Sequence, residues 1–328
     1  MAIRTVSLPH TASELAAPLA ALARACYPDM AVSVQHDEAR WLVRLFPVGE
    51  LTRARDSAIA ATLARLGVSF DEMMNWHRLD DRGPVVWLES MYHSWALLAW
   101  SCAWRRRGNV RPWLVHVAPT ADLGTPALLG SDNGSSLLAI MEDMTLDLDN
   151  QDSVRGALEK GLVGVGSYIV PWLHARAGDV VHLAPGAPAT VTTVSRFALE
   201  TEIPGTVSRL VMRHHADGRC SYRRTGDPAS LAQGWTQGQP VLLDIDLGYF
   251  DLVPNRRHEP FGKPCSIAEL VDGLLPLARS IVAVTIAYAP GSCPAGRWGQ
   301  LAAELRTALM ALLDSGLPTA NTPARGEK

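Results

Sequence analysis

Lysine is scarce in this sequence, and no sign of charge is in large excess. Among its 328 residues 30 are basic, and only three of these are lysine (Lys160, Lys263 and Lys328); Asp and Glu number 33, giving a formal net charge of -3. A field this weak gives no reason to expect nucleic acid or a membrane surface as a partner. Because nearly all the positive charge is arginine, clusters of arginine carry little information of their own.

Cysteines and long apolar runs are also few. The five cysteines form no C-x-x-C pair and are widely spread, at Cys26, Cys102, Cys220, Cys265 and Cys293. An odd, scattered set is typical of reduced thiols, so we expect a cytoplasmic protein. The N-terminus predicts an amphipathic helix from about Thr11 and not a signal peptide. The longest apolar runs, such as IVAVTIAYA (281–289), are far below the length of a membrane span.

The order of apolar segments predicts one large α/β domain with a small segment before it. From Pro84, continuous apolar strands such as VVWLE and WLVHV alternate with helix-like runs such as YHSWALLAWSCAWRRR. This rhythm is typical of a mostly parallel sheet covered on both faces. We expect the domain over 84–315, after a small α/β segment over 1–80 with helices at 11–26 and 52–66 and the strand RWLVRLFPV. A disordered tail is expected over 316–328.

Further elements are expected in the second half of the chain. The stretch LVGVGSYIV (162–170) predicts a strand after a helix that ends at Gly161. The stretches RLVMRHH and RCSYRR, joined across Ala216-Asp217-Gly218, predict a hairpin. The segments QPVLLDIDLGYF and IVAVTIAYA predict two more strands, with helices over 266–279 and from about 297 to 315.

Two aspartates end the strand within LLDIDLGYFD (242–251). Alternation sends Asp244 and Asp246 to the same side of the strand, at its carboxyl end. Two carboxylates that lie so near each other repel unless a cation or a proton neutralises part of their charge. The alternative is that they cap the loop or the next helix.

Two more polar features follow predicted strands. In LVHVAPTADLGTP (114–126), His116, Ala118, Thr120 and Asp122 stand at alternate positions, and His93 follows the strand VVWLE. The carboxyl ends of parallel strands are where open α/β sheets bind ligands. Taken alone, the loop would be a polar turn, and the histidine a packing residue.

Together these pieces resemble the arginase superfamily, and more closely its bacterial peptide arginases, which act on arginine side chains in ribosomally made peptides. The stretches YHSWALLAW, HVAPTADL, LDIDLGYF and TIAYAPGSCP stand in the family's order, over about 84–310. The resemblance implies a three-layer α/β arginase/deacetylase-like fold. It also implies hydrolysis of a guanidinium group to urea and ornithine by metal-activated water.

Carried over position by position, the resemblance implies metal ligands at His93, Asp122, Asp244 and Asp246. The three aspartates would also be the catalytic and cation-holding groups. Two family ligands are missing, because the carboxylate position is Ala118 and the histidine position is Thr120. A third family aspartate has become Gly248, which would weaken the local hydrogen bonds.

What remains could hold one divalent metal, manganese by preference, or none. His116 is a possible replacement ligand, and Asn133 lies in a loop that holds substrate in this family.

Two functions stay open at this point. The first is a hydrolase acting on an arginine-containing peptide or a small guanidinium compound, with a reduced or rebuilt metal site. The second is an inactive arginase-like protein that still binds a basic peptide or small ligand. The sequence makes no prediction about the oligomeric state.

Overall fold

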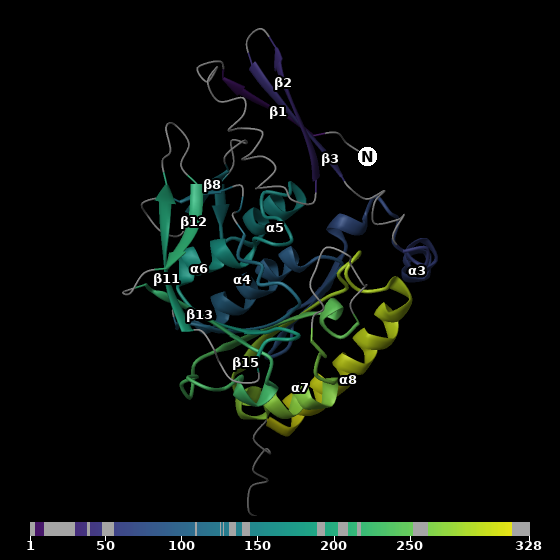
Figure 1. Ribbon diagram of the computed structural model, residues 1–328, viewed down its shortest axis with the longest axis vertical. Coiled ribbons are helices and arrows are strands. Elements are labelled where there is room, and N and C mark those ends of the chain that lie inside the picture. The colour runs from purple at the N-terminus through teal and green to yellow at the C-terminus, as the bar shows by residue number, and fades with distance from the viewer. Residues whose placement is uncertain are drawn as a thin grey trace, which may run out of the picture.

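A nine-stranded sheet forms the centre of the protein, as the computed structural model shows (Figure 1). The structure describes residues 4–9, 30–37, 40–47, 56–108, 110–124, 126, 128–130, 136–139, 145–188, 194–202, 209–214, 218–251 and 262–316. Helices lie on both sides of the sheet, so the predicted three-layer α/β class is confirmed.

The strands of the central sheet are β4 (His77–Asp80), β5 (Val86–Ser90), β6 (Trp113–Val117), β10 (Asp179–Leu183), β11 (Val194–Glu202), β12 (Arg209–His214), β13 (Cys220–Thr225), β14 (Val241–Asp246) and β15 (Ile281–Ala287). The helices are α3 (Ile59–Leu66), α4 (Ala96–Arg107), α5 (Gln151–Glu159), α6 (Ile169–Arg176), α7 (Ile267–Leu274) and α8 (Trp298–Gly316). Short 3-10 helices include η3 (His93–Trp95), η4 (Pro228–Ser230), η5 (Leu247–Tyr249) and η6 (Leu275–Ser280).

The strand order is β12-β11-β13-β10-β6-β14-β15-β5-β4. Every neighbouring pair from β13 to β5 is parallel. Strand β4 at one edge, and β11 and β12 at the other, are added antiparallel. The carboxyl ends of the parallel strands therefore meet along a single edge of the sheet, and their amino ends along the opposite edge.

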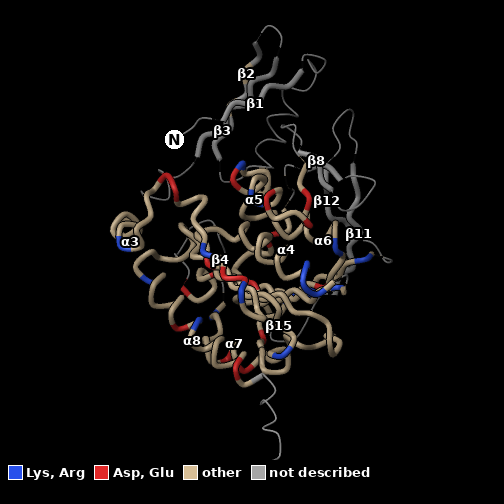
Figure 2. Tube along the Cα trace, turned by 180° about the vertical axis from the view of Figure 1, so that it is seen from behind, with Lys and Arg blue, Asp and Glu red and all other residues tan. Residues whose placement is uncertain are grey.

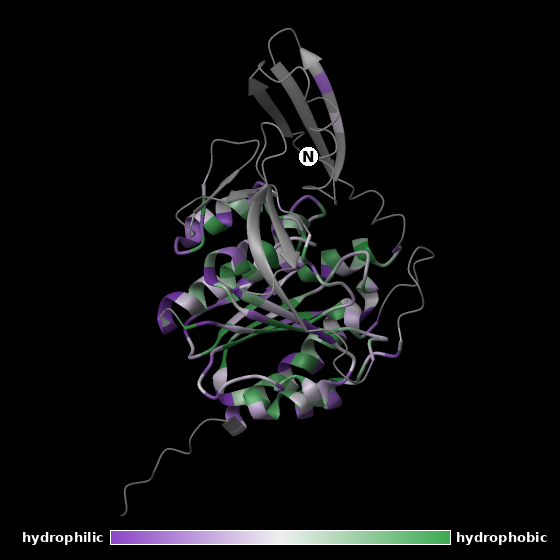
Figure 3. Cartoon of the chain, turned by 60° about the vertical axis from the view of Figure 1, so that its left-hand side comes forward, coloured by the Kyte–Doolittle hydropathy of each residue, from purple (hydrophilic) through white to green (hydrophobic). Residues whose placement is uncertain are grey.

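The central strands are apolar because both faces of the sheet are covered. Strands β6, β14 and β15 are buried along their whole length. Leu114 and Leu242 pack into a core with α4, α5 and α6, whereas Val115 and Leu243 pack with α3, α7 and α8. The two helical layers flank the sheet in Figure 1, and Figure 3 shows its hydrophobic strands between them.

The predicted strand at 162–170 is wrong. The segment turns and then enters α6, and β10 takes the place beside β6. Pro171 is tolerated near the start of this helix, where its missing N–H loses no bond. Tyr168 and Trp172 pack against Trp100 of α4, with ring centroids 5.6 and 5.5 Å away. This aromatic packing belongs to the helical layer and not to the sheet.

The predicted hairpin across residues 216–218 is also wrong. Strand β11 lies between β12 and β13, and β13 pairs in parallel with β10 on its other side. Pairing with β10 buries Cys220 and Thr225 in the sheet. This long-range burial outweighs the local preference of the turn sequence for a hairpin.

Smaller sheets and the N-terminal residues complete the described chain. The strands β1 (Arg4–Pro9), β2 (Met30–Asp37) and β3 (Arg40–Pro47) form one antiparallel sheet, and β3 is the predicted strand RWLVRLFPV. The strands β7 (Leu128–Gly130), β8 (Ser136–Ala139) and β9 (Thr145–Asp147) form another. The helix expected at 11–26 and the tail beyond 316 lie outside the described residues.

Residues 56–80 pack with the large domain. Ile59 and Leu63 of α3 lie in the same core cluster as Trp298, and the division expected at 80–84 runs between the paired strands β4 and β5. In the part of the chain that the structure describes, no helix is both long and apolar enough to cross a membrane. Figure 2 shows basic and acidic residues interspersed along this part.

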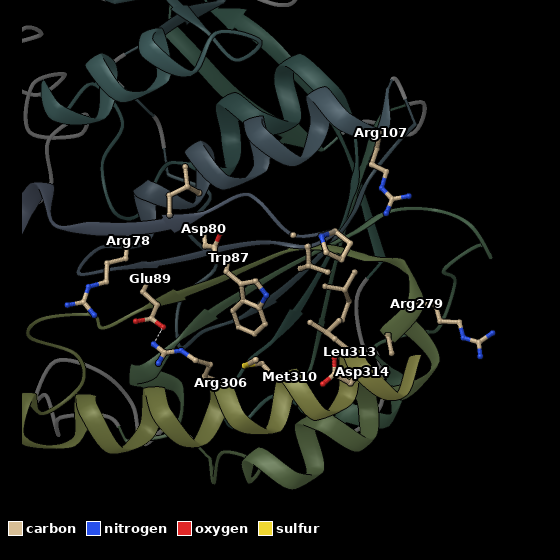
Figure 4. Close-up of a pocket in the computed structure, with 16 residues that line it drawn as sticks. Arg78, Asp80, Trp87, Glu89, Arg107, Arg279, Arg306, Met310, Leu313 and Asp314 are labelled. Atoms are coloured by element: carbon tan, nitrogen blue, oxygen red, sulfur yellow. Dashed lines mark hydrogen bonds and ion pairs between the residues drawn. The ribbon is translucent and has the colours of Figure 1, made fainter. Parts of the chain in front are cut away.

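A cavity of about 610 Å³ lies between α8 and the β4–β5 edge of the sheet (Figure 4). Trp87 lies in it, and at one side Arg306 of α8 donates a hydrogen bond to the Glu89 carboxylate. Tyr288 also donates to Glu89, at 3.1 Å. Glu89 is only 7% exposed, so this ion pair joins α8 to a buried charge of β5.

Replacing Arg306 by Met should lower the free energy of unfolding by about 1–2 kcal/mol, because a largely buried carboxylate loses its cation. Urea denaturation measures this change. Arg297→Met is the matched control: the side chain of its partner Asp251 is 38% exposed, so the loss of this ion pair should cost less than about 1 kcal/mol. Equal effects of the two substitutions would contradict the role given to Glu89.

Candidate functional site

A row of polar side chains crosses the buried centre of the sheet. His182 of β10, His116 of β6, Asp244 of β14 and Thr285 of β15 are register partners on neighbouring strands. None of them is more than 2% exposed. Buried polar groups are costly unless they are hydrogen-bonded, so the bonds within this row determine what the site can do.

Asp244 is fully buried, and hydrogen-bond donors occupy both of its oxygens. The Thr285 hydroxyl donates to Oδ1 at 2.5 Å, and the Tyr168 hydroxyl donates to Oδ2 at 2.5 Å. His116 Nδ1 lies 2.9 Å from the same Oδ2. Burial alone would raise the pKa of Asp244, but the hydrogen bond from His116 and the nearby imidazole of His93 outweigh it and hold the pKa below the usual value.

The imidazole of His116 lies between two carboxylates. Its Nε2 is 2.9 Å from the Thr120 carbonyl oxygen and 3.5 Å from Asp122 Oδ2. With acceptors at both ring nitrogens, only the doubly protonated ring can donate at each. Burial would lower the pKa of His116, yet the bond to Asp244 and the charge of Asp122 raise it above its ordinary value.

His93 and Asp246 form a second buried pair. His93 begins η3, and its Nε2 lies 2.9 Å from Asp246 Oδ2 while its Nδ1 lies 4.0 Å from Asp244 Oδ2. Asp244 and Asp246 therefore share one side of the strand, as alternation predicted. Burial would lower the pKa of His93, but Asp246 and Asp244 raise it well above its ordinary value. Asp246 Oδ1 also accepts the Gly248 N–H at 2.6 Å and caps η5, so the capping alternative holds as well.

The loop after β6 holds Asp122 in an uncommon backbone conformation. Its φ of 50° lies in the left-handed region, which a residue other than glycine rarely adopts without functional or structural cause. The Thr120 hydroxyl donates to Asp122 Oδ1 at 2.7 Å, and the Gly124 N–H donates to the Gly166 carbonyl at 2.8 Å. Burial raises the pKa of Asp122. The loop is thus tied to the segment that leads to Tyr168.

We call the six residues brought together here the carboxyl-edge cluster: His93, His116, Asp122, Tyr168, Asp244 and Asp246. All five of the candidate metal positions named from the sequence belong to it, and their roles as ligands or catalytic groups stay predictions. Ala118 is buried and Thr120 is exposed. Asn133 lies outside the described residues.

Gly248 stands where the sequence suggested a lost aspartate. A Cβ there would lie 3.0 Å from Asp246 Oδ1 and 3.0 Å from the Ser292 Cβ. Such contacts are tighter than packed atoms normally allow, so in this structure the position favours glycine.

Sequence reasoning missed three members of the network. Tyr168 lay in a segment predicted as a strand, and Thr285 looked like part of an apolar run. His182 could have been found, because VVHLAP (180–185) repeats the pattern of LVHVAP (114–119). In the structure His182 Nε2 lies 2.9 Å from the Ala118 carbonyl oxygen and Nδ1 lies 2.6 Å from the Tyr222 hydroxyl.

The residues of the cluster do not fit the metal site that the resemblance implies. A hard divalent ion needs several free oxygen or nitrogen lone pairs aimed at one point. Here both Asp244 oxygens accept hydrogen bonds, and the His116 ring separates Asp122 from Asp244. The methyl side chain of Ala118 has no atom that could bind a metal. Among the described residues, no group of three or more His, Cys, Asp and Glu side chains could hold a metal ion.

Comparison with known proteins gives little further information. No protein-family model matches the chain, and no curated protein matches it either. One solved structure that it resembles is proclavaminate amidino hydrolase from Streptomyces clavuligerus, with a TM-score of 0.40 and 15% sequence identity. The match covers 70% of this chain and 63% of that one, so the chain spans less than two thirds of the solved structure.

Replacing Tyr168 by Phe should lower the free energy of unfolding by about 1–3 kcal/mol. The substitution keeps the ring but leaves a buried carboxylate oxygen of Asp244 with one donor fewer. Chemical denaturation would measure the loss. An unchanged stability would mean that the hydroxyl contributes nothing to holding Asp244.

Replacing Gly124 by Ala should lower the free energy of unfolding by about 1–3 kcal/mol, because its Cβ would lie 2.8 Å from the Gly166 carbonyl oxygen. The matched control is Gly299→Ala in α8, where a Cβ would have no heavy atom within 4 Å. That substitution should raise stability by up to about 1 kcal/mol. No loss at Gly124, or an equal loss at both positions, would contradict the constraint given to the loop contact.

Proposed function

We propose that this chain binds a guanidinium group, in a peptide arginine or a small compound, without hydrolysing it. The observation that carries the proposal is the position of the His116 ring between Asp122 and Asp244. A metal that shared these two carboxylates would need the space that the ring occupies. The cluster then serves to hold a cation at its outer side and not to activate water.

The charges and positions of the outer residues support a cationic ligand. Asp122 and Asp246 are 7% and 3% exposed, whereas Asp244, His116 and Tyr168 are completely buried. Three carboxylates face two imidazoles, so negative charge is in excess even when both rings are protonated. Carboxylates pair with guanidinium through short parallel hydrogen bonds, and the carboxyl edge of a parallel sheet is where such folds bind ligands.

The second candidate is the metal-dependent hydrolase implied by the resemblance. It is favoured by the fact that His93, Asp122, Asp244 and Asp246 all lie in one cluster although they are far apart in sequence. Such an enzyme would require the His116 ring and the Tyr168 hydroxyl to leave Asp244. Manganese, a peptide substrate and retained catalysis all belong to this candidate.

Calorimetry on the full chain with N-acetyl-arginine amide and with agmatine tests the proposal, together with elemental analysis after incubation with manganese. We expect saturable binding of at least one probe, an affinity that EDTA leaves unchanged, no stoichiometric metal and no urea. Asp246→Asn should weaken binding by about tenfold or more, since it removes a charge-assisted bond. The amide can still accept the Gly248 N–H.

The matched control is Asp272→Asn, which changes an exposed aspartate of α7. This helix packs in the layer with α3 and α8, on the other face of the sheet from α6. This variant should bind each probe as the unaltered protein does. Stoichiometric manganese together with release of urea would overturn the proposal in favour of the hydrolase. Failure of both probes to bind the metal-free protein would also overturn it.

A further inference from the structure

A second cavity, with a more polar lining than the one beside α8, lies at the opposite edge of the sheet from the carboxyl-edge cluster. It has a volume of about 860 Å³. Trp113, Asp179 and Ser221, at or next to the amino ends of β6, β10 and β13, line it, together with the loop at 233–239. The parallel strands lead away from this cavity and toward the cluster, so the two sites are separated by the length of the strands.

Arg223 of β13 is a buried cation at the wall of this cavity. The side chain is only 8% exposed, and its guanidinium carbon lies 5.4 Å from the centre of the Trp113 ring. Its Nη2 donates to the Ser230 carbonyl at 3.1 Å, and its Nη1 makes a long bond of 3.4 Å to Gln233 Oε1. Its Nε is buried and has no hydrogen-bond partner.

In the part of the chain that the structure describes, the guanidinium of Arg223 forms no ion pair. Among the described residues, no carboxylate lies within 4.0 Å of it. The neighbouring Asp179 accepts hydrogen bonds from Arg111, at 2.7 Å, and from the Ser221 hydroxyl instead. Burial lowers the pKa of Arg223, and Asp179 offsets this only in part. Among the described residues, the lining thus holds two arginines against one aspartate, a surplus of one positive charge.

Burying an unpaired charge is costly, and the cost is relieved when an opposite charge is brought to it. Guanidinium is well suited to carboxylates and phosphates, which it binds through two parallel bonds. The exposed amides of Gln233 and Gln237 lie around the opening and can donate to other oxygens of such a ligand. The volume is that of a small organic molecule and exceeds that of a simple inorganic ion.

We infer that this cavity is a binding site for a small organic anion whose carboxylate or phosphate group pairs with Arg223. Trp113 forms the apolar wall behind the guanidinium. Gln233 is the group that gives way, because its bond to Arg223 is long and comes from an exposed side chain, whereas the Ser230 and Leu231 acceptors are backbone carbonyls. The site is independent of the function proposed for the carboxyl-edge cluster.

Calorimetry and thermal unfolding of the full chain test this inference, with citrate as a carboxylate probe and inorganic phosphate as a phosphate probe. All buffers are brought to equal ionic strength with sodium chloride. We expect saturable binding of at least one probe and a melting temperature that rises with its concentration. Arg223→Gln should weaken that binding by about tenfold or more. The matched control is Arg224→Gln on the same strand, which alters an exposed arginine and should bind as the unaltered protein does.

Gln233→Glu gives a test that does not depend on removing Arg223. The new carboxylate would have nearly the shape of the amide and would lie beside the guanidinium of Arg223. It would therefore pair with the guanidinium in place of an anionic ligand. We expect a higher melting temperature without any probe and loss of the response to citrate and phosphate. The inference is overturned if neither probe binds the unaltered protein. It is also overturned if Gln233→Glu leaves the response intact, or if Arg223→Gln folds and binds as before.

Discussion

The structure of the candidate site depends on one buried carboxylate. Asp244 lies at the centre of the sheet with no exposed surface, where a charge is tolerated only when donors surround it. Thr285 and His116 reach it from the two neighbouring strands, and Tyr168 reaches it from the start of a helix. Much of the surrounding layout follows from this requirement, because each donor must be held in place by its own element.

The same requirement explains why the site departs from a metal centre. In the family that the sequence resembles, divalent ions neutralise the clustered carboxylates. Here two imidazoles and a phenol donate to them instead. Hydrogen-bond donors fill lone pairs one at a time and in fixed directions, so a cluster satisfied in this way has no common point left for an ion. The side chain of Ala118, which has no atom that could bind a metal, is consistent with such a cluster.

Much of the fold and of the carboxyl-edge cluster could be predicted from the sequence. The features that could not be predicted were missed for physical reasons. Alternation placed Asp244 and Asp246 on one side of a strand, and the parallel sheet placed Asp122 and His93 at the same edge. Tyr168 escaped prediction because short apolar runs do not distinguish a strand from the entry to a buried helix. The pairing of β13 with β10 and β11 escaped it because the choice depends on burial between segments distant in sequence. Hydrogen-bond partners such as Thr285 become visible only when the register of the strands is known.

His116 and His182, which occupy matching positions on adjacent strands, show that the neighbouring groups determine the pKa of a buried histidine. His116 and His182 are register neighbours with ring centroids 5.0 Å apart, so two charged rings would repel. His116 faces Asp244 and Asp122, and its pKa is raised; burial and the nearby charge of His116 lower the pKa of His182 well below the ordinary value. Among the described residues, the ring nitrogens of His182 lie within hydrogen-bond distance of the carbonyl oxygen of Ala118 and the Tyr222 hydroxyl, and both of these groups are uncharged. Because His116 has acceptors at both ring nitrogens, the positive charge of the row lies on His116, beside the two aspartates that it separates.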